Sequence, residues 1–343
     1  MRSCKPERSV LFTREPSIIS EQRTAKEPAW TANKGVTRRE RFFGEMDAEI
    51  PWTELVAFIT PVCPKRHQYQ SGRPAVAIGA LLRIYFLQHW FDLSDPAAED
   101  ALYDSEAMRH FVSVEIAGNA SPDETTILLF RHLLEAHRLI EELFEAVCDL
   151  FEAKGLLLTA GTIVDATILQ APSSTKNATG TRDPEMKQTQ KGKTWHFGMK
   201  VHVGTDRRGV VHSLTTTHAA AADIRQLPDL LHGAERALYG DQAYWSESDR
   251  RHAEAAAVRY RVNRRPTRQR PLSARWRRIN RARSRVRARG EHAFHVVKTL
   301  WGFTTVRYRG LAKNTARVYA AFALANLYLM RYALGAREAR CLS

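Results

Sequence analysis

The chain has 343 residues, of which 44% are hydrophobic and 26% are charged, a balance typical of a folded protein with a buried core. Its 52 Lys and Arg residues against 37 Asp and Glu residues give a formal net charge of +15, which indicates a polyanionic partner, either nucleic acid or an anionic membrane surface. The 4 cysteines are far apart and the basic N-terminus has no apolar leader, so we expect a cytoplasmic protein and not a secreted disulfide scaffold.

The first third of the chain is predicted to be helical behind a basic arm. Residues 1–45 are polar and basic with scattered Pro, Ser and Thr, which is typical of a flexible arm. Residues 46–155 show helical patterns instead. The run over 75–91 is apolar on most faces and predicts a buried helix, and the segment 94–112, which opens with Ser94 as a cap, predicts a second helix.

A third helix is predicted over 121–155. It opens with Ser121 and Glu124 at the spacing of a capping box, and it stops at Gly155. Helices joined by short linkers can form a helix-turn-helix that enters the major groove of DNA, with Arg131 as a contact residue. A plain helical bundle explains the same pattern equally well, so both interpretations stay open.

After Gly155 the pattern changes from helical to extended. The β-branched residues of 156–171 predict a strand, and the Ser, Thr, Lys, Gly and Pro residues of 172–194 predict a loop. Residues 195–218 alternate on both sides of a Gly-containing turn at 206–209, which predicts a hairpin. This half of the chain therefore opens with antiparallel strands.

The rest of the chain alternates between helices and strands. The predicted elements are a helix over 223–232, a strand over 237–240, a helix over 246–257, a strand over 258–262 and a long helix over 274–299. This order predicts a mixed α/β domain. A last apolar run over 318–330 is too short to span a bilayer and predicts a buried C-terminal helix.

The positive charge is concentrated in one segment. Residues 259–289 contain 14 arginines in 31 positions, and no acidic residue lies between Glu254 and Glu291. A membrane-surface helix would carry large apolar residues on its other face, and this segment has few of them. Because arginines suit phosphate contacts, the segment indicates nucleic acid, although a solvated basic loop is the alternative. The contact residues expected are Arg264, Arg265, Arg275, Arg277 and Arg278.

Two aspartates at predicted strands are candidate metal ligands. Asp165 interrupts the apolar strand over 156–171, where a carboxylate has to be paired, bound to metal or at a rim. Asp241 follows the strand over 237–240, and α/β sheets bind ligands at strand ends. Taken alone, a strand-end aspartate is more often a helix cap or a turn former.

Glu291 is the more specific candidate because of its helical neighbours. Arg287 precedes it by four residues and Lys298 follows it by seven. At about 100° per residue, these offsets put the three side chains on one face of the helix predicted over 274–299. A metal site beside a phosphodiester needs a carboxylate between two cations, although an ordinary surface ion-pair ladder has the same pattern.

The first strand of the predicted hairpin carries further polar candidates. His196, Lys200 and His202 lie at alternate positions and should share one face. They could line a DNA channel, or the histidines could be structural. Trp195 and Trp301 are predicted to anchor the core and not to act as wedges between bases.

From about residue 40 onward the chain resembles a known family. The stretches that carry the resemblance are LQHWFDLSDPAAEDALYDS, PDETTILLFRHLLE, VDATILQAPSSTKN, RDPEMKQTQKGKTWHFGMKVH and VRARGEHAFHVVKTLWGFTTVRYRGLAKN. They are similar to the DDE transposases of the insertion sequence five family, within the insertion sequence four superfamily. The resemblance implies an α/β fold with a ribonuclease-H-like mixed sheet and flanking helices, preceded by an all-α N-terminal domain.

The resemblance also implies which acids are catalytic, and these map onto Asp165, Asp241 and Glu291. The superfamily's third-acid motif is a Tyr, then an Arg three residues later, a Glu four residues after the Arg and a Lys seven residues after the Glu. Arg287, Glu291 and Lys298 fit this spacing. The tyrosine position holds Ser284 here, which puts a base-handling role at that position in doubt.

The activity that the resemblance implies is the cutting of DNA at terminal inverted repeats and the transfer of the cut strand to a target. Three carboxylates would hold two Mg²⁺ or Mn²⁺ ions for this chemistry. The expected partners are double-stranded DNA and further copies of the chain, as a homodimer or larger synaptic complex in a bacterial nucleoid, with no membrane. The alternatives are an inactive DNA-binding relic and a metal-dependent nuclease without strand transfer.

The resemblance and the patterns together divide the chain into parts. The flexible arm is expected over 1–45 and a helix-turn-helix-like DNA-binding domain over 46–155. The catalytic domain is expected over 156–335, with the arginine-rich insertion at 259–289, and a tail over 336–343.

Overall fold

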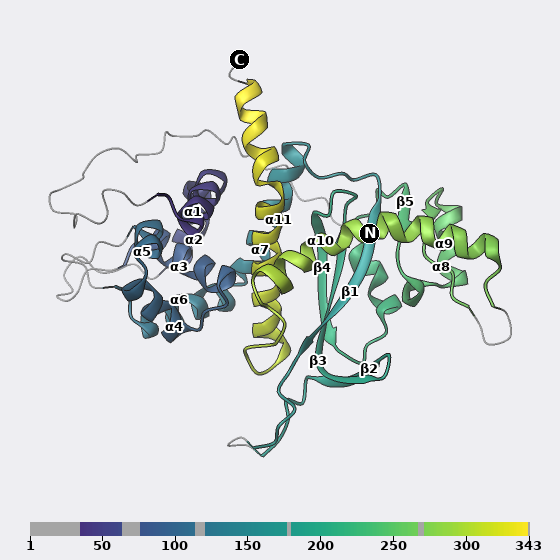
Figure 1. The fold of residues 1–343 in the computed structure, drawn as a ribbon, viewed down its shortest axis with the longest axis horizontal. Helices are drawn as coiled ribbons and strands as arrows, with labels where there is room; N and C mark the ends of the chain where they lie inside the picture. The colour runs from purple at the N-terminus through teal and green to yellow at the C-terminus, as the bar shows by residue number, and fades with distance from the viewer. Residues whose placement is uncertain (1–34, 64–75, 114–120, 177–179, 267–270, 342–343) are drawn as a thin grey trace. The chain divides into compact units, whose positions relative to one another are not determined.

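Figure 1 shows a computed structural model of the chain, which describes residues 35–63, 76–113, 121–176, 180–266 and 271–341. The described residues from Arg39 onward belong to one compact unit. Within the described ranges, no helix is long and apolar enough to cross a membrane.

The N-terminal part of the chain is helical, as expected. Its helices are α1 (Arg38–Glu49), α2 (Trp52–Ile59), the short η1 (Thr60–Val62), α3 (Ile78–Trp90), α4 (Asp95–Asp104), α5 (Glu106–Val112), α6 (Glu124–Ala136) and α7 (Leu139–Ala153). Ser94 caps α4 as predicted, since its side-chain oxygen accepts a hydrogen bond from the backbone N–H of Ala97 at 3.2 Å.

Helix α1 begins inside the segment predicted to be a flexible arm. Phe42 packs against Trp90 with ring centroids 5.0 Å apart, and Phe43 stacks on Phe111 with centroids 4.8 Å apart. Burial of two aromatic side chains stabilises a helix that the polar residues around them do not suggest. The prediction of a flexible arm is therefore wrong from Arg38 onward, and the rest of it, residues 1–34, lies outside the described residues.

Two helices predicted as single elements are each divided in two. Ser105 ends α4 and caps α5, and Arg138, with a left-handed backbone at φ 55°, separates α6 from α7.

The capping box predicted at Ser121 is wrong. The cap of α6 is Asp123, whose Oδ1 accepts the backbone N–H of Thr126 at 2.7 Å, because a carboxylate at this position supplies the same acceptor one residue before the helix begins.

A six-stranded mixed sheet follows these helices. Its strands are β1 (Thr162–Gln170), β2 (Lys187–Lys191), β3 (Thr194–Thr205), β4 (Val211–His218), β5 (Ala237–Tyr239) and β6 (Arg259–Tyr260). The order is β2-β3-β1-β5-β6, and β4 also pairs with β3. β1 is antiparallel to β3 and parallel to β5, which confirms the mixed, ribonuclease-H-like sheet behind an N-terminal helical region.

Strand β2 lies in the segment 172–194, which the sequence predicts to be a loop. Its residues, Lys-Gln-Thr-Gln-Lys, include no apolar side chain, so the alternation that identifies a strand is missing. β2 pairs with β3 from Lys187 opposite Gly198 to Lys191 opposite Thr194. Pairing with an existing strand, and not burial of its own side chains, makes this segment a strand.

The helices of the C-terminal half are η2 (Asp223–Leu230), η3 (Gln242–Tyr244), α8 (Glu247–Ala255), α9 (Ala274–Arg287), η4 (Ala288–Gly290), α10 (Glu291–His295), the π-helix η5 (Val296–Leu300) and α11 (Leu311–Cys341). The helix predicted over 223–232 is a 3₁₀ helix containing Pro228, which has no N–H for α-helical bonding. The apolar run over 318–330 forms the middle of α11.

The long helix predicted over 274–299 is not continuous. α9 ends at Arg287, and the chain passes through η4 and α10 into η5. The irregularity occurs where the backbone lies against the sheet, since a Cβ added at Gly290 would be 3.0 Å from Cγ2 of Ile163 and from Oγ1 of Thr205. In Figure 1, α9 and α10 run across the strands at this level. Close approach to β1 is a tertiary constraint that helical periodicity does not reveal.

The two faces of the sheet belong to different hydrophobic clusters. Leu169, Val201 and Val203 join a large cluster with residues of α3, α7 and α11. Val164, on the other face of β1, joins a smaller cluster around η2 and β6. Because neighbouring residues of a strand alternate between faces, Asp165 lies on the face of the large cluster, next to α9 and η4.

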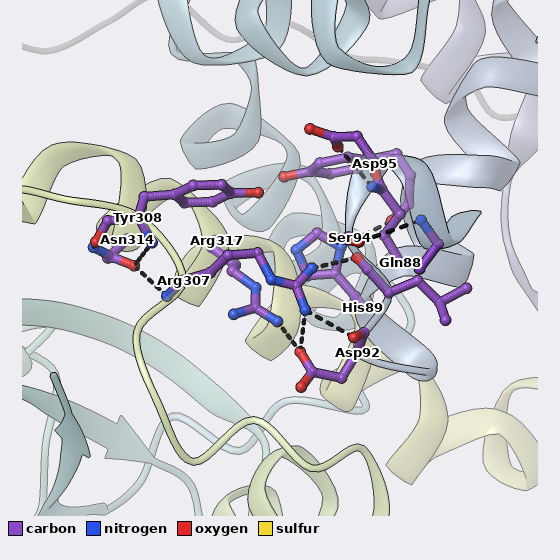
Figure 2. Close-up of polar contacts among 12 residues, drawn as sticks. Gln88, His89, Asp92, Ser94, Asp95, Arg307, Tyr308, Asn314 and Arg317 are labelled. Atoms are coloured by element: carbon purple, nitrogen blue, oxygen red, sulfur yellow. Dashed lines mark hydrogen bonds and ion pairs between the residues drawn. The ribbon is translucent and has the colours of Figure 1, made fainter. Parts of the chain in front are cut away.

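A polar network joins the turn between α3 and α4 to the chain around α11 (Figure 2). The carboxylate of Asp92 in this turn pairs with Arg307 at 2.7 Å and also with Arg317 of α11. Asn314 fixes the segment before α11, because its Oδ1 accepts the backbone N–H of Arg307 at 3.2 Å. The N-terminal helices are thus tied to the C-terminal half by charges as well as by apolar contacts.

His89 belongs to this network and is neutral. Burial lowers its pKa to about 3, and the charge of Arg317 contributes in the same direction. Its Nδ1 lies 2.8 Å from the carbonyl oxygen of Tyr85, and because a carbonyl only accepts, Nδ1 carries the proton. The charge balance of the network therefore rests on its acids and arginines.

Candidate active site

Asp165 lies on β1, and Asp241 follows the end of the parallel strand β5 by two residues. The register pairs Ile163 with Tyr239, so the same register continued by two residues brings Asp165 beside Asp241 on one face. Gly240 permits the close approach, since an added Cβ would lie 2.9 Å from a methyl carbon of β1. Two aspartates that are far apart in the sequence are thereby brought together.

Arg287 connects Asp165 to Glu291. Its Nη1 lies 2.9 Å from Oδ2 of Asp165, and its Nη2 lies 3.4 Å from Oε1 of Glu291. Glu291 is the first residue of α10 and is half exposed, at 54%. One guanidinium therefore stands between two carboxylates that come from β1 and from α10.

The electrostatic environment of Asp165 favours a cation. The pKa of this carboxyl is raised to about 6, because burial and the charges of Asp241 and Glu291 outweigh the lowering by Arg287 and by the backbone N–H of Ala166. Only 15% of the side chain is exposed. A buried carboxylate with two acidic neighbours is stabilised as an anion by positive charge placed among them.

The donor atoms fit a hard divalent cation, but the described residues contain no preformed group of three or more His, Cys, Asp or Glu side chains that could hold one. Carboxylate oxygens are the ligands that Mg²⁺ and Mn²⁺ prefer. Arg287 stands between Asp165 and Glu291, so an ion bound by both acids would have to replace its guanidinium. The site fits the metal chemically, with Arg287 as the group that must move.

Lys298 also faces β1. Its Nζ donates to Oγ1 of Thr167 and to the carbonyl of Ile168, both at 3.0 Å, and Thr167 lies on the same face of β1 as Asp165. Lys298 belongs to the π-helix η5, a local widening often found at functional sites. Although the helix predicted here is interrupted, Arg287 and Lys298 are both directed at this strand.

The structure does not bring Lys200, His202 and His196 to the acids. The three residues share one face, as predicted, but it is the opposite face from Asp165, because Asp165 pairs with Val203 of β3. Lys200 is held by Asp223 at 2.8 Å. His202 is fully buried, with its Nε2 2.9 Å from Oγ1 of Thr217.

His196 lies nearer the start of β3 and its Nδ1 is 3.4 Å from the side-chain amide of Gln170. Burial lowers the pKa of His202 to about 4, so His202 is neutral at physiological pH. Lys200 and His202 therefore form a structural group on the far face of the sheet, and the prediction that they line a DNA channel is not supported.

Arg131 is unsuited to the DNA contact predicted for it. The side chain is buried, with 6% exposed, and its guanidinium pairs with Asp95 and Glu135, each at 2.9 Å. It also lies over the ring of Tyr308, 4.5 Å from the centroid. A phosphate would have to displace two carboxylates inside the protein to reach this guanidinium. Arg131 instead belongs to the network that connects α6 to the C-terminal half.

Of the remaining predicted DNA contacts, Arg275, Arg277 and Arg278 lie on the helix α9, whereas Arg264 and Arg265 precede it in a stretch without regular secondary structure. Ser273 caps this helix, and Arg264 packs over the ring of Trp276 at 4.9 Å. No side chain of α9 is buried. Arginines that are exposed and without a carboxylate partner among the described residues include Arg264, Arg265, Arg275, Arg277 and Arg278.

Ser284, at the position of the motif's tyrosine, is engaged within the protein. Its Oγ accepts a hydrogen bond from Nδ2 of Asn263 at 3.0 Å. Asn263 follows β6, so the contact fixes α9 to the edge of the sheet. A side chain of this size offers no ring for stacking on a base.

The two tryptophans predicted to be core anchors differ. Trp301 is buried, with 6% exposed, and that prediction is confirmed, whereas Trp195 is 60% exposed and the prediction is wrong. Trp195 pairs with Gln190 of β2, a strand that the sequence did not reveal. Because Phe197 and Met199 alternate with Trp195 along β3, the sequence pattern predicts that all three are buried.

Comparison with known proteins identifies two family models along the chain. One, described as a transposase DDE domain, matches residues 158–327. The other, described as a transposase domain, matches residues 31–133. The two matches do not overlap and together cover most of the chain, and the first contains all three acids of the candidate site.

Proposed function

Because the chain belongs to the DDE transposases, we propose that it cuts DNA at the terminal inverted repeats of its own insertion sequence and joins the cut strand to a target. The observation that carries this proposal is the environment of Asp165: the charges of Asp241 and Glu291 raise its pKa, and Arg287 joins it to Glu291. Asp165, Asp241 and Glu291 are the proposed catalytic residues and metal ligands.

Two Mg²⁺ or Mn²⁺ ions bound by these acids would activate the attacking oxygen and stabilise the leaving oxygen. Arg287 pairs with two carboxylates of the site and would leave them when metal binds. When it leaves the carboxylates, its guanidinium becomes available for a bidentate phosphate contact. Lys298, held beside Thr167, would contact the same DNA backbone next to the acids. Release of Arg287 would thus couple metal binding to DNA binding.

We propose that the parts of the chain have separate roles. Residues 46–155 recognise the element end, and 156–335 carry the chemistry, with 259–289 as a phosphate-binding insertion and 336–343 as a tail. Double-stranded DNA from the element ends and the target is the substrate. Since two ends have to be processed together, we expect a homodimer or larger synaptic complex in the bacterial nucleoid.

The test is a cleavage reaction with the purified chain, labelled element ends and Mg²⁺. We expect metal-dependent cuts at the ends and, after addition of target DNA, joined products. The controls are the same reaction with a chelator and with a duplex whose repeat is scrambled. Cuts without joined products would favour a nuclease without strand transfer, and binding without cuts in any divalent metal would indicate an inactive relic.

The salt dependence of binding tests the phosphate role of α9. Replacing Arg275, Arg277 and Arg278 with glutamine should reduce the slope of log Kd against log salt by about three, since each lost phosphate contact lowers the slope by about one. Because these side chains are exposed, the variant should melt like the wild type. A matched triple change at exposed Arg38, Arg41 and Arg225 serves as control, and an equal loss of slope there would contradict a specific role for α9.

A further inference from the structure

Trp195 has a large apolar side chain that is mostly exposed to solvent. Its exposed fraction is 60%, at the start of β3, and its ring contacts no other aromatic ring or cation in the described part of the chain. A single exposed apolar side chain is common on protein surfaces, so the ring indicates a binding site only together with the charges around it. A flat aromatic ring with one free N–H can stack on another flat, partly polar group.

The surroundings of Trp195 are basic. β2 and the turn that follows it contribute Lys187, Lys191 and Lys193, all exposed, and no acidic residue lies between Lys187 and Trp195. The nearest preceding acids, Asp183 and Glu185, accept backbone N–H groups at the start of α11. This hairpin, residues 187–195, therefore combines an open ring with uncompensated positive charge, the combination that binds nucleic acid by stacking and by phosphate contacts.

The hairpin is also near the proposed active site. The charge of Lys191 contributes to lowering the pKa of Lys298, after burial, so the turn of the hairpin and η5 are within electrostatic range. Along β3, Trp195 is eight residues from Val203, which lies opposite Asp165. At about 3.3 Å per residue this is at most roughly 26 Å, the length of about eight nucleotide steps of duplex DNA.

We propose that hairpin 187–195 is a DNA-binding element in which Trp195 stacks on a base of the element end, within about eight nucleotides of the cut phosphate, while its lysines contact the backbone. This inference rests on the proposed function for the identity of the DNA. Trp195 would supply an aromatic contact with a base. It lies elsewhere in the sequence than Ser284, which replaces the tyrosine of the third-acid motif.

Photochemical cross-linking of the full-length chain tests the contact. The probes are element-end duplexes in which single thymines are replaced by 5-iodouracil, which cross-links to an aromatic ring stacked on it, and unrelated duplexes substituted in the same way. We expect a cross-link to the peptide that contains Trp195, from positions within about eight nucleotides of the cut. Trp195→Ala should abolish it, and Tyr332→Ala, at an exposed aromatic residue of α11, should not.

Affinity measurements separate stacking from charge. Trp195→Ala should weaken binding about tenfold or more at every salt concentration, and Trp195→Phe should restore part of it. The slope of log Kd against log salt should not change in either variant, whereas Lys193→Ala should lower it by about one. Since Trp195 is exposed and makes no ring contact, the thermal midpoint of Trp195→Ala should match the wild type.

Failure of this inference and failure of the proposed function give different results. A persistent cross-link and unchanged affinity in Trp195→Ala would overturn the role of the hairpin, whatever the DNA. A Trp195 cross-link that forms equally with unrelated duplexes, in a chain that neither prefers nor cuts element ends, would contradict the proposed function and support the hairpin as a DNA contact.

Discussion

Replacing Asp241 with asparagine is expected to slow strand cleavage by about a thousandfold or more, because loss of one carboxylate ligand removes several kcal/mol of charge stabilisation in the transition state. The fold should survive the change. Oδ1 of Asp241 accepts the backbone N–H of Ala243 at 2.8 Å, and asparagine keeps an oxygen for this cap. The measurement is single-turnover cleavage of labelled element ends with Mg²⁺, beside thermal melting of both proteins.

The matched control is Asp229→Asn, at an exposed aspartate of η2 that makes no charge contact in the described structure. It removes the same charge and should cleave at the wild-type rate. Equal cleavage by the wild type and by Asp241→Asn would show that the proposed acid site is wrong. Glu291→Gln should resemble Asp241→Asn, whereas Asp165→Asn should also alter the melting temperature, since it removes the nearer partner of Arg287.

Local patterns were sufficient for the main elements of the fold. The β-branched run around Asp165 and the alternation on both sides of the 206–209 turn predicted β1, β3 and β4, and the structure confirms them. The patterns failed where tertiary contacts decide. β2 has no apolar residue to mark it, and α1 depends on Phe42 and Phe43 reaching rings of α3 and α5.

The sequence predicted the candidate site only in part, for the same reason. The spacing of Arg287, Glu291 and Lys298 marked a polar helical face, because helical neighbours are fixed by local geometry. The placement of Asp165 beside Asp241 depends on the register of two strands far apart in the sequence, which no local rule supplies. Nor does the pattern of β3 tell which of its faces meets α9.

Charge alone was the least reliable guide to DNA contacts. Arg131, Lys200 and Arg264 look alike in the sequence, but the first is buried between two acids and the second is held by Asp223. Only Arg264 is exposed without such a partner. Basic residues are available to phosphate when the fold gives them no carboxylate, and that depends on long-range contacts.

Replacing Asp92 with asparagine is expected to lower the free energy of unfolding by about 1–2 kcal/mol, because it leaves the buried charge of Arg317 without its carboxylate, although solvent at Asp92, whose side chain is 39% exposed, screens part of the interaction. The side chain of Arg317 is only 6% exposed, and Asp92 is also the partner of Arg307. Asparagine tolerates the left-handed backbone of residue 92, at φ 51°. The loss therefore reports charge and not backbone strain, and chemical denaturation at constant salt measures it.

The double variant identifies the cause of that loss. In Asp92→Asn with Arg317→Met, the most buried charge of the group, that of Arg317, is removed together with its carboxylate, so part of the stability should return relative to Asp92→Asn alone. Asp100→Asn, at an exposed residue of α4, should leave stability unchanged. If the double variant is less stable than Asp92→Asn by the full cost of Arg317→Met alone, the two residues do not act together. A positive coupling would instead show that this ion pair holds the α3–α4 turn to α11, and that the helices of the N-terminal part depend on the C-terminal half for their stability.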